Sequence, residues 1–359
     1  MRTTLLLALA VVFWPVCTEA GQGGDWMLRL TLDGEKIEGK PLSWNESMVY
    51  LLGRDGRLWG FHPKDAVDFQ KSSNRFRSYS PSELRARLLR ELGNAYEVSG
   101  TTHYLVAHPR GQRDRWAQRF EDLYRSFTHY FSVRGFKPKR PPFLQVGIVC
   151  KDRRDFHRFS AQQGMPAPAG VAGYYGVASN RIMLFDAGAS SNSARWQENA
   201  STVIHEATHQ TAFNAGVHSR YTPPPVWVAE GLATMFEAPG VYDSRHHSAE
   251  TDRVNPRRLA EFRALAKSNT DAKVLPELIS SDGMFRRNAH SAYGLSWALT
   301  FYLVETQPRK YSKYLTLTAS RPPFSDYSAA ERLDDFTSVF GTNWVMLYAR
   351  LGRFVGGLK

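Results

Sequence analysis

Hydrophobic residues first recur with the two-residue period of β-strands. The run Trp26–Asp33 alternates apolar with polar positions, Met48–Leu52 and Arg57–Phe61 are further short β-type runs, and Asp-Gly pairs lie between the runs. Alternation of this kind predicts half-buried strands, and Asp-Gly predicts tight turns between strands. We therefore expect a small β module over residues 21–70, of the size of a small barrel. This stretch of sequence contains no cluster of His, Cys or acidic residues, so its expected role is structural or in targeting.

The pattern then changes to one that favours helices. Lys71–Ser80 is polar and basic and is expected to be a linker. Ser80-Pro81-Ser82-Glu83 carries a capping residue, a proline in the first turn and a glutamate three residues on, which together predict a helix start. This helix is expected to run to Leu92, so that linker and helix occupy residues 71–94.

Residues 95–359 mix both periods and are expected to form one large domain. Tyr96–Val98 and His103–Ala107 read as paired strands, Leu144–Cys150 as a buried strand and Arg154–Gln163 as a helix. Arg113–Val133 carries aromatic residues at three- and four-residue spacing, which predicts a long amphipathic helix. Its aromatic stripe is expected to pack in the core rather than to bind a ligand. The mixture of both periods predicts an α+β fold.

A hairpin is expected next. Gly170–Ala178 and Arg181–Asp186 are β-type runs joined by Ser179-Asn180, which favours a tight turn. If the outer edge is free, an extended peptide could pair with it; an ordinary covered hairpin is equally compatible with the sequence.

The last third of the chain is expected to be mostly helical, including Ser291–Glu305 and Thr342–Phe354. His246–Arg258 is polar and rich in His and Arg, and it is expected to be a solvated loop.

Composition places the chain among soluble globular proteins, since 42% of its 359 residues are hydrophobic. Residues 1–20 contain Arg2, an apolar run from Leu5 to Trp14 and a small residue at Ala20, which predicts a signal peptide removed after about Ala20. An uncleaved anchor is the alternative, and the short apolar run disfavours it. A secreted, periplasmic or cell-envelope protein follows from this prediction. Cleavage would leave Cys150 as the one cysteine, so no internal disulfide is expected.

The formal net charge of +12 narrows the expected partners. The basic residues are scattered and no nucleic-acid-binding motif accompanies them, so nucleic acid is not expected as a partner. An anionic cell-envelope surface remains compatible with the charge.

One short motif carries recognisable chemistry. His205-Glu206-Ala207-Thr208-His209 has the pattern H-E-x-x-H, in a segment predicted to be helical from about Ser193 to Ala215. Two histidines four residues apart project from the same face of a helix, and neutral imidazoles are good zinc ligands. A glutamate next to the first histidine can act as a general base toward water at the metal. The motif therefore predicts one catalytic zinc ion, with His205 and His209 as ligands and Glu206 as the base.

A catalytic zinc needs a third protein ligand, and Glu230 is the favoured one. Pro223-Pro224-Pro225 predicts the start of a second helix, Val226–Glu237, in which Glu230 lies among apolar residues. A carboxylate in such surroundings is costly to bury unless it has a partner. The rival ligand is His218, but it falls three residues beyond the last histidine position of H-E-x-x-H-x-x-G-x-x-H, which Ala215 occupies.

With these residues the chain resembles the gluzincin metallopeptidases, particularly the MA-like group of secreted bacterial proteins of poorly defined function. The resemblance rests on His205, Glu206, His209 and the Ala-Glu-Gly-Leu-Ala segment around Glu230, and it extends loosely from about residue 96 to residue 351. It implies a gluzincin-like domain over residues 95–359, with a mixed sheet whose edge strand binds substrate, an active-site helix and a helical C-terminal subdomain.

The sequence differs from the gluzincin pattern at one position, and the resemblance also implies an oxyanion donor. Thr234 stands where thermolysin-like members carry an aspartate that orients a ligating histidine, so another carboxylate is needed, with Glu237 and Asp186 as open alternatives. Gluzincins further need a donor for the oxyanion, and Tyr293 is the favoured residue, with His290 one turn earlier as a weaker one. Tyr293 could instead be a packing aromatic.

The predicted function is hydrolysis of peptide bonds by a zinc-dependent peptidase acting on a peptide or protein substrate. A non-catalytic binding or scaffold protein of the envelope, built on a metallopeptidase fold, is the alternative. A zinc hydrolase of another amide or ester is a third.

Overall fold

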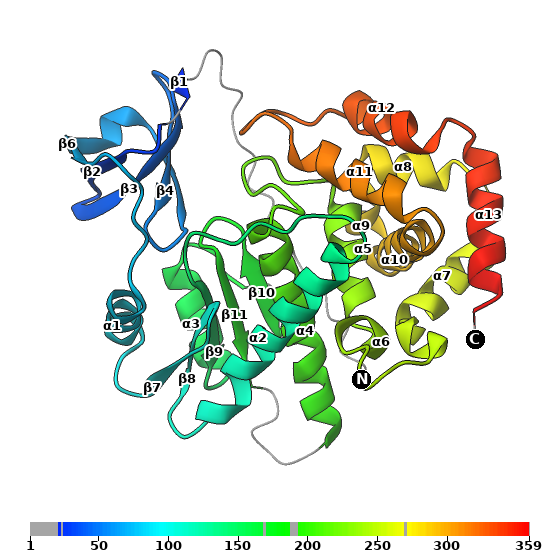
Figure 1. The fold of residues 1–359 in the computed structure, drawn as a ribbon, viewed down its shortest axis with the longest axis horizontal. Coiled ribbons are helices and arrows are strands. Elements are labelled where there is room, and N and C mark those ends of the chain that lie inside the picture. Colours follow the sequence, from blue (N-terminus) through cyan, green and yellow to red (C-terminus); the bar gives the residue numbers. More distant parts are fainter. Residues whose placement is uncertain (1–20, 23, 168–169, 187–192, 269–270, 359) are drawn as a thin grey trace. The chain divides into compact units, whose positions relative to one another are not determined.

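The computed structural model describes residues 21–22, 24–167, 170–186, 193–268 and 271–358. The predicted signal peptide, residues 1–20, lies outside the described residues. The chain divides into two compact units, the first comprising Met1–Glu121, Arg140–Asn199 and Pro323–Ser325, and the second comprising Asp122–Lys139, Ala200–Pro322 and Asp326–Lys359. Each unit is built on its own hydrophobic contacts and is described by itself (Figure 1).

The first unit begins with an antiparallel sheet formed by the predicted β module. Its strand order is β5-β4-β3-β2-β6, with the short β1 paired to β3. Asp33 and Gly34 both have positive φ, at 51° and 81°, as a two-residue hairpin turn between β2 and β3 requires. The elements are β1 (Gly21–Gln22), β2 (Met27–Leu32), β3 (Glu35–Trp44), β4 (Val49–Gly53), β5 (Leu58–Phe61), the 3-10 helix η1 (Pro63–Asp65) and β6 (Ala66–Ser73). The predicted linker is therefore shorter than Lys71–Ser80, because β6 pairs with β2 as far as Ser73.

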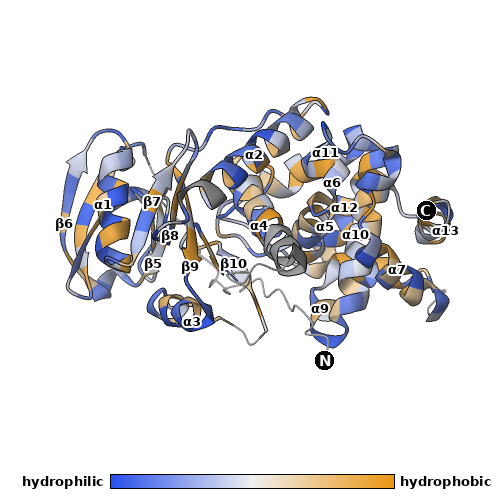
Figure 2. Cartoon of the chain, turned by 90° about the horizontal axis from the view of Figure 1, so that it is seen from below, coloured by the Kyte–Doolittle hydropathy of each residue, from blue (hydrophilic) through white to orange (hydrophobic). Residues whose placement is uncertain are grey.

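The second sheet of this unit is mixed. Its order is β10-β11-β9-β8-β7, and β8, β9 and β11 run parallel, whereas β7 and β10 are antiparallel edges. The strands are β7 (Tyr96–Gly100), β8 (Tyr104–Pro109), β9 (Gln145–Cys150), β10 (Gly173–Gly176) and β11 (Arg181–Phe185). Every residue of β8 and β9 is buried, and Figure 2 shows the hydrophobic colouring of β9. Buried strands of this kind read as continuous apolar runs, as the sequence at Leu144–Cys150 indicated.

Helices cover both faces of the mixed sheet. On one face, α1 (Pro81–Leu92) and α3 (Arg153–Gln162) pack apolar side chains against β8, β9 and β11. On the other face, Phe120 of α2 (Arg113–Ser132) contacts Tyr104, with ring centroids 5.3 Å apart. The predicted start of α1 is confirmed: the side chains of Ser80 and Glu83 each bond the other's backbone N–H.

The expected hairpin is present as β10 and β11, but its turn is longer than the two residues predicted. Gly176 pairs with Arg181, so four residues form the connection, and Asn180 adopts a positive φ of 57°. The β10 strand is an edge of the sheet. Whether a peptide pairs with this edge stays a prediction.

The second unit is helical and is centred on α10. This helix is buried from Ala292 to Val304 and packs on α5, α7, α11 and α13. The helices are α4 (Ser193–Asn214, from Ala200 onward in this unit), α5 (Val226–Phe236), α6 (Pro239–Tyr242), η2 (Glu250–Arg253), α7 (Pro256–Ser268), α8 (Val274–Ser280), α9 (Gly283–Arg287), α10 (Ala289–Thr306), α11 (Pro308–Ala319), α12 (Ala329–Phe340) and α13 (Trp344–Gly356).

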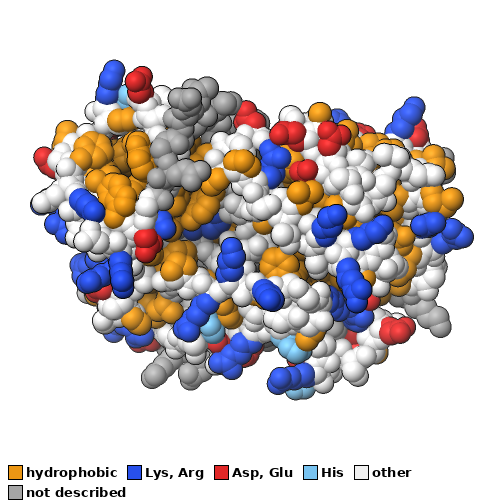
Figure 3. Space-filling view, turned by 45° about the horizontal axis from the view of Figure 1, so that its top comes forward, with side chains coloured by type: hydrophobic (Ala, Val, Ile, Leu, Met, Phe, Trp, Pro, Cys, Tyr) orange, Lys and Arg blue, Asp and Glu red, His pale blue; other side chains and the backbone are white. Residues whose placement is uncertain are grey.

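Together these elements confirm an α+β fold with a small β module, a mixed sheet and a helical region. None of the described helices has both the length and the apolar character needed to cross a membrane. Lys and Arg side chains are spread over the face drawn in Figure 3 instead of forming one patch, so the charge on this face does not mark a single site.

Candidate metal centre

Two helices of the second unit carry the predicted ligands. His205 and His209 lie four residues apart on α4 and turn their rings toward one another, at a centroid distance of 4.7 Å. Glu230 comes from α5, which begins directly after Pro225 as predicted. The free backbone N–H of Val226 at the start of α5 donates to Asp282, which fixes this end of the helix.

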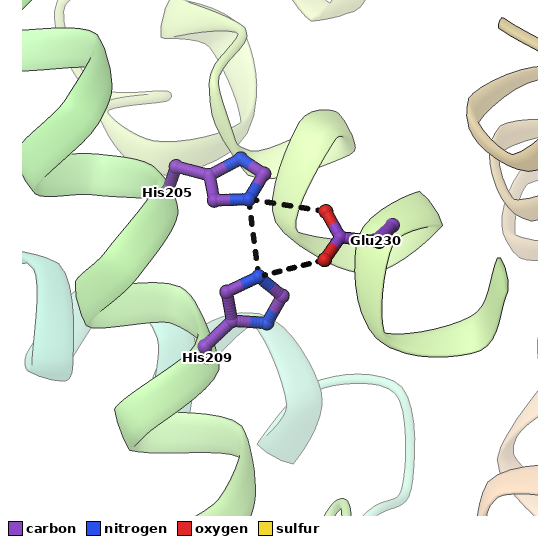
Figure 4. A group of neighbouring side chains, drawn as sticks. All are labelled: His205, His209 and Glu230. Carbon is purple, nitrogen blue, oxygen red and sulfur yellow. Dashed lines mark hydrogen bonds and ion pairs between the residues drawn. The ribbon is translucent and has the colours of Figure 1, made fainter. Parts of the chain in front are cut away.

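The three side chains converge on one point (Figure 4). His205 Nε2 lies 3.0 Å from His209 Nε2 and 3.2 Å from Glu230 Oε2, and His209 Nε2 lies 3.5 Å from Glu230 Oε1. All three residues are buried, with exposed fractions of 1%, 3% and 1%. Each of the three side chains offers one atom that could bind a metal ion, and these three atoms lie within 4.8 Å of one another.

The spacing of these atoms fits a zinc ion. Ligand atoms about 2.0–2.1 Å from zinc in tetrahedral geometry are separated by roughly 3.3 Å from each other. The observed separations of 3.0, 3.2 and 3.5 Å lie around that value, with His205 facing Oε2 of Glu230 and His209 facing Oε1. Two imidazoles and one carboxylate are also a donor set found at catalytic zinc sites with an open fourth position. The donor set and spacing of His205, His209 and Glu230 are therefore compatible with a zinc ion.

The outer nitrogen of His205 has its own partner. His205 Nδ1 lies 2.8 Å from Glu237 Oε1, and Glu237 Oε2 accepts a hydrogen bond from Asn255 Nδ2 at 2.8 Å. A carboxylate on the far side of a ligating histidine fixes its tautomer and orientation and leaves the other ring nitrogen to face the metal. Of the two carboxylates left open by the sequence, Glu237 occupies this position. Asp186 belongs to the first unit, where it accepts a hydrogen bond from Gln112.

A buried arginine completes this group of side chains. Arg258 is 3% exposed; its Nη2 lies 4.0 Å from Glu237 Oε1, and its Nη1 donates to Glu261 Oε2 at 2.8 Å. The expectation of a solvated loop over His246–Arg258 is therefore wrong at its end, because Asn255 and Arg258 are both buried. Asn255 caps α7 by accepting from the backbone N–H of Arg258, and Asn before Pro256 is a sequence signal that could have marked this helix start.

The close carboxylates shift the protonation of the group in the metal-free state. Burial alone would lower the pKa of His205, but the hydrogen bonds with Glu230 and Glu237 and the nearby charge of Glu206 raise it to about 10. Burial would raise the pKa values of Glu230 and Glu237, and their contacts with the histidines outweigh burial and lower both. These contacts favour a protonated His205 beside ionised carboxylates.

Glu206 lies on α4 next to His205 and is 2% exposed. Its negative charge raises the pKa of both His205 and Tyr293.

Tyr293 of α10 reaches the same site. Burial, the charge of Glu230 and a hydrogen bond to Glu230 raise the pKa of Tyr293 well above its ordinary value, so it stays a neutral donor. Its ring packs edge-on against Phe285, at 5.3 Å, and under the guanidinium of Arg258, at 4.6 Å.

The two weaker sequence candidates lie elsewhere. His290 has a side chain that is 55% exposed and pairs with Glu261 at 3.2 Å. His218 is buried and donates from Nδ1 to the carbonyl of Val217, and it is not in the group of three. Burial and the charge of His209 lower the pKa of His218 to about 3, so it is neutral.

Part of the chain matches a described protein family. A family model described as "Protein of unknown function (DUF1570)" matches residues 199–325, which include all three predicted ligands and Glu206. No curated protein matches the chain in sequence.

Among solved structures, the chain is similar to a mutant of the M1 zinc metallopeptidase from Deinococcus radiodurans, with 13% identity and a TM-score of 0.38, over 95% of this chain and 62% of that one. The same mutant bound to a Tyr-Ser-Ala substrate gives 12% identity and a TM-score of 0.36, over 95% and 62% of the two chains. A two-domain M1 zinc metallopeptidase mutant bound to L-arginine gives 11% and 0.36, over 95% and 61%. The chain thus spans less than two thirds of these proteins, and at such TM-scores its chemistry has to be argued from its own residues.

Proposed function

We propose that this protein is a zinc-dependent hydrolase that cleaves peptide bonds. The observation that carries the proposal is the convergence of His205, His209 and Glu230, whose ligand atoms lie within 4.8 Å of one another, as one bound zinc ion requires. A carboxylate next to a ligating histidine and a buried tyrosine beside the third ligand supply the two further groups that such hydrolysis needs. We also propose that the protein is a metallopeptidase of the gluzincin type.

His205, His209 and Glu230 would hold the metal. When bound, zinc supplies a Lewis acid that polarises a carbonyl group and makes a water molecule acidic near neutral pH. Because three protein side chains occupy the ligand positions, a fourth position remains for water or substrate.

Glu206 acts first as the general base and then as the general acid. Its carboxylate accepts a proton from the water that attacks the carbonyl carbon and donates that proton to the nitrogen of the leaving amine. Burial of Glu206 keeps bulk water from competing with this transfer. Glu206 is not needed to hold the metal. A substitution at Glu206 should therefore remove proton transfer and leave zinc binding intact.

Tyr293 stabilises charge. Its raised pKa keeps the hydroxyl protonated, so it can donate a hydrogen bond to the oxygen that becomes negative during attack. This donor is useful only if the hydroxyl exchanges its bond with Glu230 for one with the substrate.

We also propose that the protein acts outside the cytoplasm, as the residue pattern of positions 1–20 predicts. Identification of the N-terminus of the protein recovered from its native host tests this part separately.

The test of the proposal combines metal analysis with an unbiased substrate search. Purified protein is loaded with one equivalent of zinc and incubated with a diverse peptide library, and the products are identified by mass spectrometry. We expect cleavage that a chelator abolishes and added zinc restores. His205→Ala should neither retain zinc nor cleave. Stoichiometric zinc without cleavage of any peptide would favour the alternative, a binding or scaffold protein on this fold.

A further inference from the structure

Arg258 contacts two parts of the candidate site at once. From the first turn of α7, its guanidinium lies against Glu237, at 4.0 Å, and over the ring of Tyr293, at 4.6 Å. Glu237 in turn holds His205. Arg258 is therefore the side chain that connects the orientation of a predicted metal ligand with the position of the predicted oxyanion donor.

Ion pairing alone is a weak reason for a fold to bury this arginine. A buried ion pair is often matched or exceeded in stability by apolar residues of similar volume. Arg258 is nearly fully buried, and its Nε is a buried donor for which no hydrogen-bond acceptor is found within the described part of the chain. Such a group is costly to bury, so its contacts with Glu237 and Tyr293 call for another explanation.

The packing of two helices makes the arrangement rigid. At Gly294, next to Tyr293 on α10, an added Cβ would lie 2.7 Å from the backbone N of Phe262 and 2.8 Å from Cβ of Glu261, both on α7. The backbones of α7 and α10 are therefore in close contact one residue from Tyr293. This close packing supports the observed stacking of the Arg258 guanidinium on the Tyr293 ring, at 4.6 Å.

The chemistry of guanidinium suits this double contact. It is planar and always charged, so its face can stack on an aromatic ring while its edge pairs with carboxylates. Here the edge pairs with Glu261 through Nη1 and faces Glu237 through Nη2. Lysine provides only a point charge and cannot do both.

We propose that Arg258 is a positioning residue that sets both the orientation of His205, through Glu237, and the placement of Tyr293. The part of this inference that concerns Tyr293 rests on the proposed function, since Tyr293 matters only if the site hydrolyses a substrate. The part that concerns His205 is about metal affinity and stands without any catalytic activity.

The experiment compares Arg258→Met, Arg258→Lys and the matched control Arg257→Met. Arg257 is the neighbouring arginine, half exposed, and pairs with the same Glu261 at 3.2 Å. For each folded variant, zinc affinity is measured by competition with a chromophoric chelator. Values of kcat and KM are measured on the best peptide from the library.

For Arg258→Met we expect zinc affinity to fall about tenfold, as is typical when a group supporting a ligand is lost. We also expect kcat to fall about 10- to 100-fold with little change in KM, because a misplaced donor affects the transition state alone. Arg258→Lys should restore most of the zinc affinity and little of kcat. Arg257→Met should match the wild type in both.

The inference is overturned if Arg258→Met keeps wild-type zinc affinity and kcat, or if Arg257→Met loses as much as Arg258→Met. If Arg258→Met does not fold, Arg258→Lys decides alone: wild-type kcat in that variant overturns the inference, and a loss of kcat with retained zinc supports it. If the wild type binds zinc but cleaves nothing, the proposed function fails, and the zinc affinities still decide whether Arg258 positions His205.

Discussion

Glu237 Oε1 lies 2.8 Å from Nδ1 of His205, on the opposite side of the ring from the nitrogen that faces His209 and Glu230. This contact directs Nε2 of His205 into the group of predicted ligands. It also gives the carboxylate of Glu237 a role that its place at the end of α5 does not reveal.

Loss of this carboxylate should weaken metal binding without unfolding the protein. We expect Glu237→Ala to lower zinc affinity about 10- to 100-fold, the usual effect of removing the partner of a ligating histidine. Glu237→Gln retains an acceptor oxygen and should lose less. Chelator competition measures both, and Glu250→Gln, at an exposed glutamate, is the control. Equal affinities for Glu237→Ala and wild type would show that the contact does not support the metal.

Zinc binding should release a proton near neutral pH. The pKa of His205 is raised to about 10 in the metal-free protein, so the ring must lose a proton before Nε2 can bind zinc. The apparent zinc affinity should therefore rise up to tenfold per pH unit between about 6.5 and 10. Calorimetry in buffers of different ionisation enthalpy counts the protons released. Release of none at pH 7 would contradict the protonation described for the metal-free site.

The same shift predicts how the metal-free protein responds to alkali. A raised folded-state pKa contributes stability that is fully present below the unfolded value of about 6.5 and is lost as pH rises through about 10. The unfolding free energy of the metal-free protein should thus fall by up to about 1.4 kcal/mol per pH unit in that window. Urea unfolding at several pH values measures this, and the zinc-loaded protein, whose His205 holds no extra proton, should lack that contribution.

The close contact of α5 with α10 should not tolerate a methyl group at Gly231. A Cβ there would lie 2.2 Å from Thr300 Oγ1 and 2.6 Å from the carbonyl oxygen of Ser296. Overpacking costs about 1–3 kcal/mol, and better helix propensity offsets about 0.5–1 kcal/mol of it. We expect Gly231→Ala to destabilise by about 1–2 kcal/mol and to weaken zinc binding, because Glu230 is its neighbour.

Gly352 provides the matched control for that substitution. It lies within α13, and an added Cβ there meets nothing within 4 Å. Gly352→Ala should leave stability unchanged or raise it by up to about 1 kcal/mol. Thermal unfolding of both variants decides, and similar stabilities for the two would contradict the close packing of α5 on α10.

Tyr293 should matter for turnover alone. We expect Tyr293→Phe to lower kcat about 100- to 1,000-fold with zinc affinity and KM near those of the wild type, as for other lost oxyanion donors. Tyr302→Phe, at a buried tyrosine on the same helix, should be close to wild type. A Tyr293→Phe variant with full kcat would leave Tyr293 as a packing aromatic, the other prediction from the sequence.

The sequence predicted the parts of this site that depend on local spacing. His205 and His209 share a helical face by their four-residue separation alone, and the three prolines before Val226 marked the start of α5. The convergence of Glu230 on both histidines agrees with the argument that a carboxylate among apolar residues needs a partner. The roles of these residues in binding zinc stay predictions.

The sequence did not predict the features of the site that depend on how separate helices pack against one another. Glu237 and Asp186 were equal candidates in sequence, since helical spacing does not show which carboxylate reaches the far side of His205. Arg258 was missed because it follows a polar stretch that reads as solvated, although α7 turns it inward onto Tyr293. The four-residue turn before Arg181 differs from the expected two because strand pairing stops at Gly176.

The most direct test of the central claim is one experiment on Glu206→Gln beside the wild type. Both proteins are analysed for bound zinc and then incubated with the peptide that the wild type cleaves best. The proposed mechanism predicts one zinc per molecule in each protein and cleavage by the wild type only, because glutamine cannot accept the proton of the attacking water. Cleavage by zinc-loaded Glu206→Gln at the wild-type rate would contradict it.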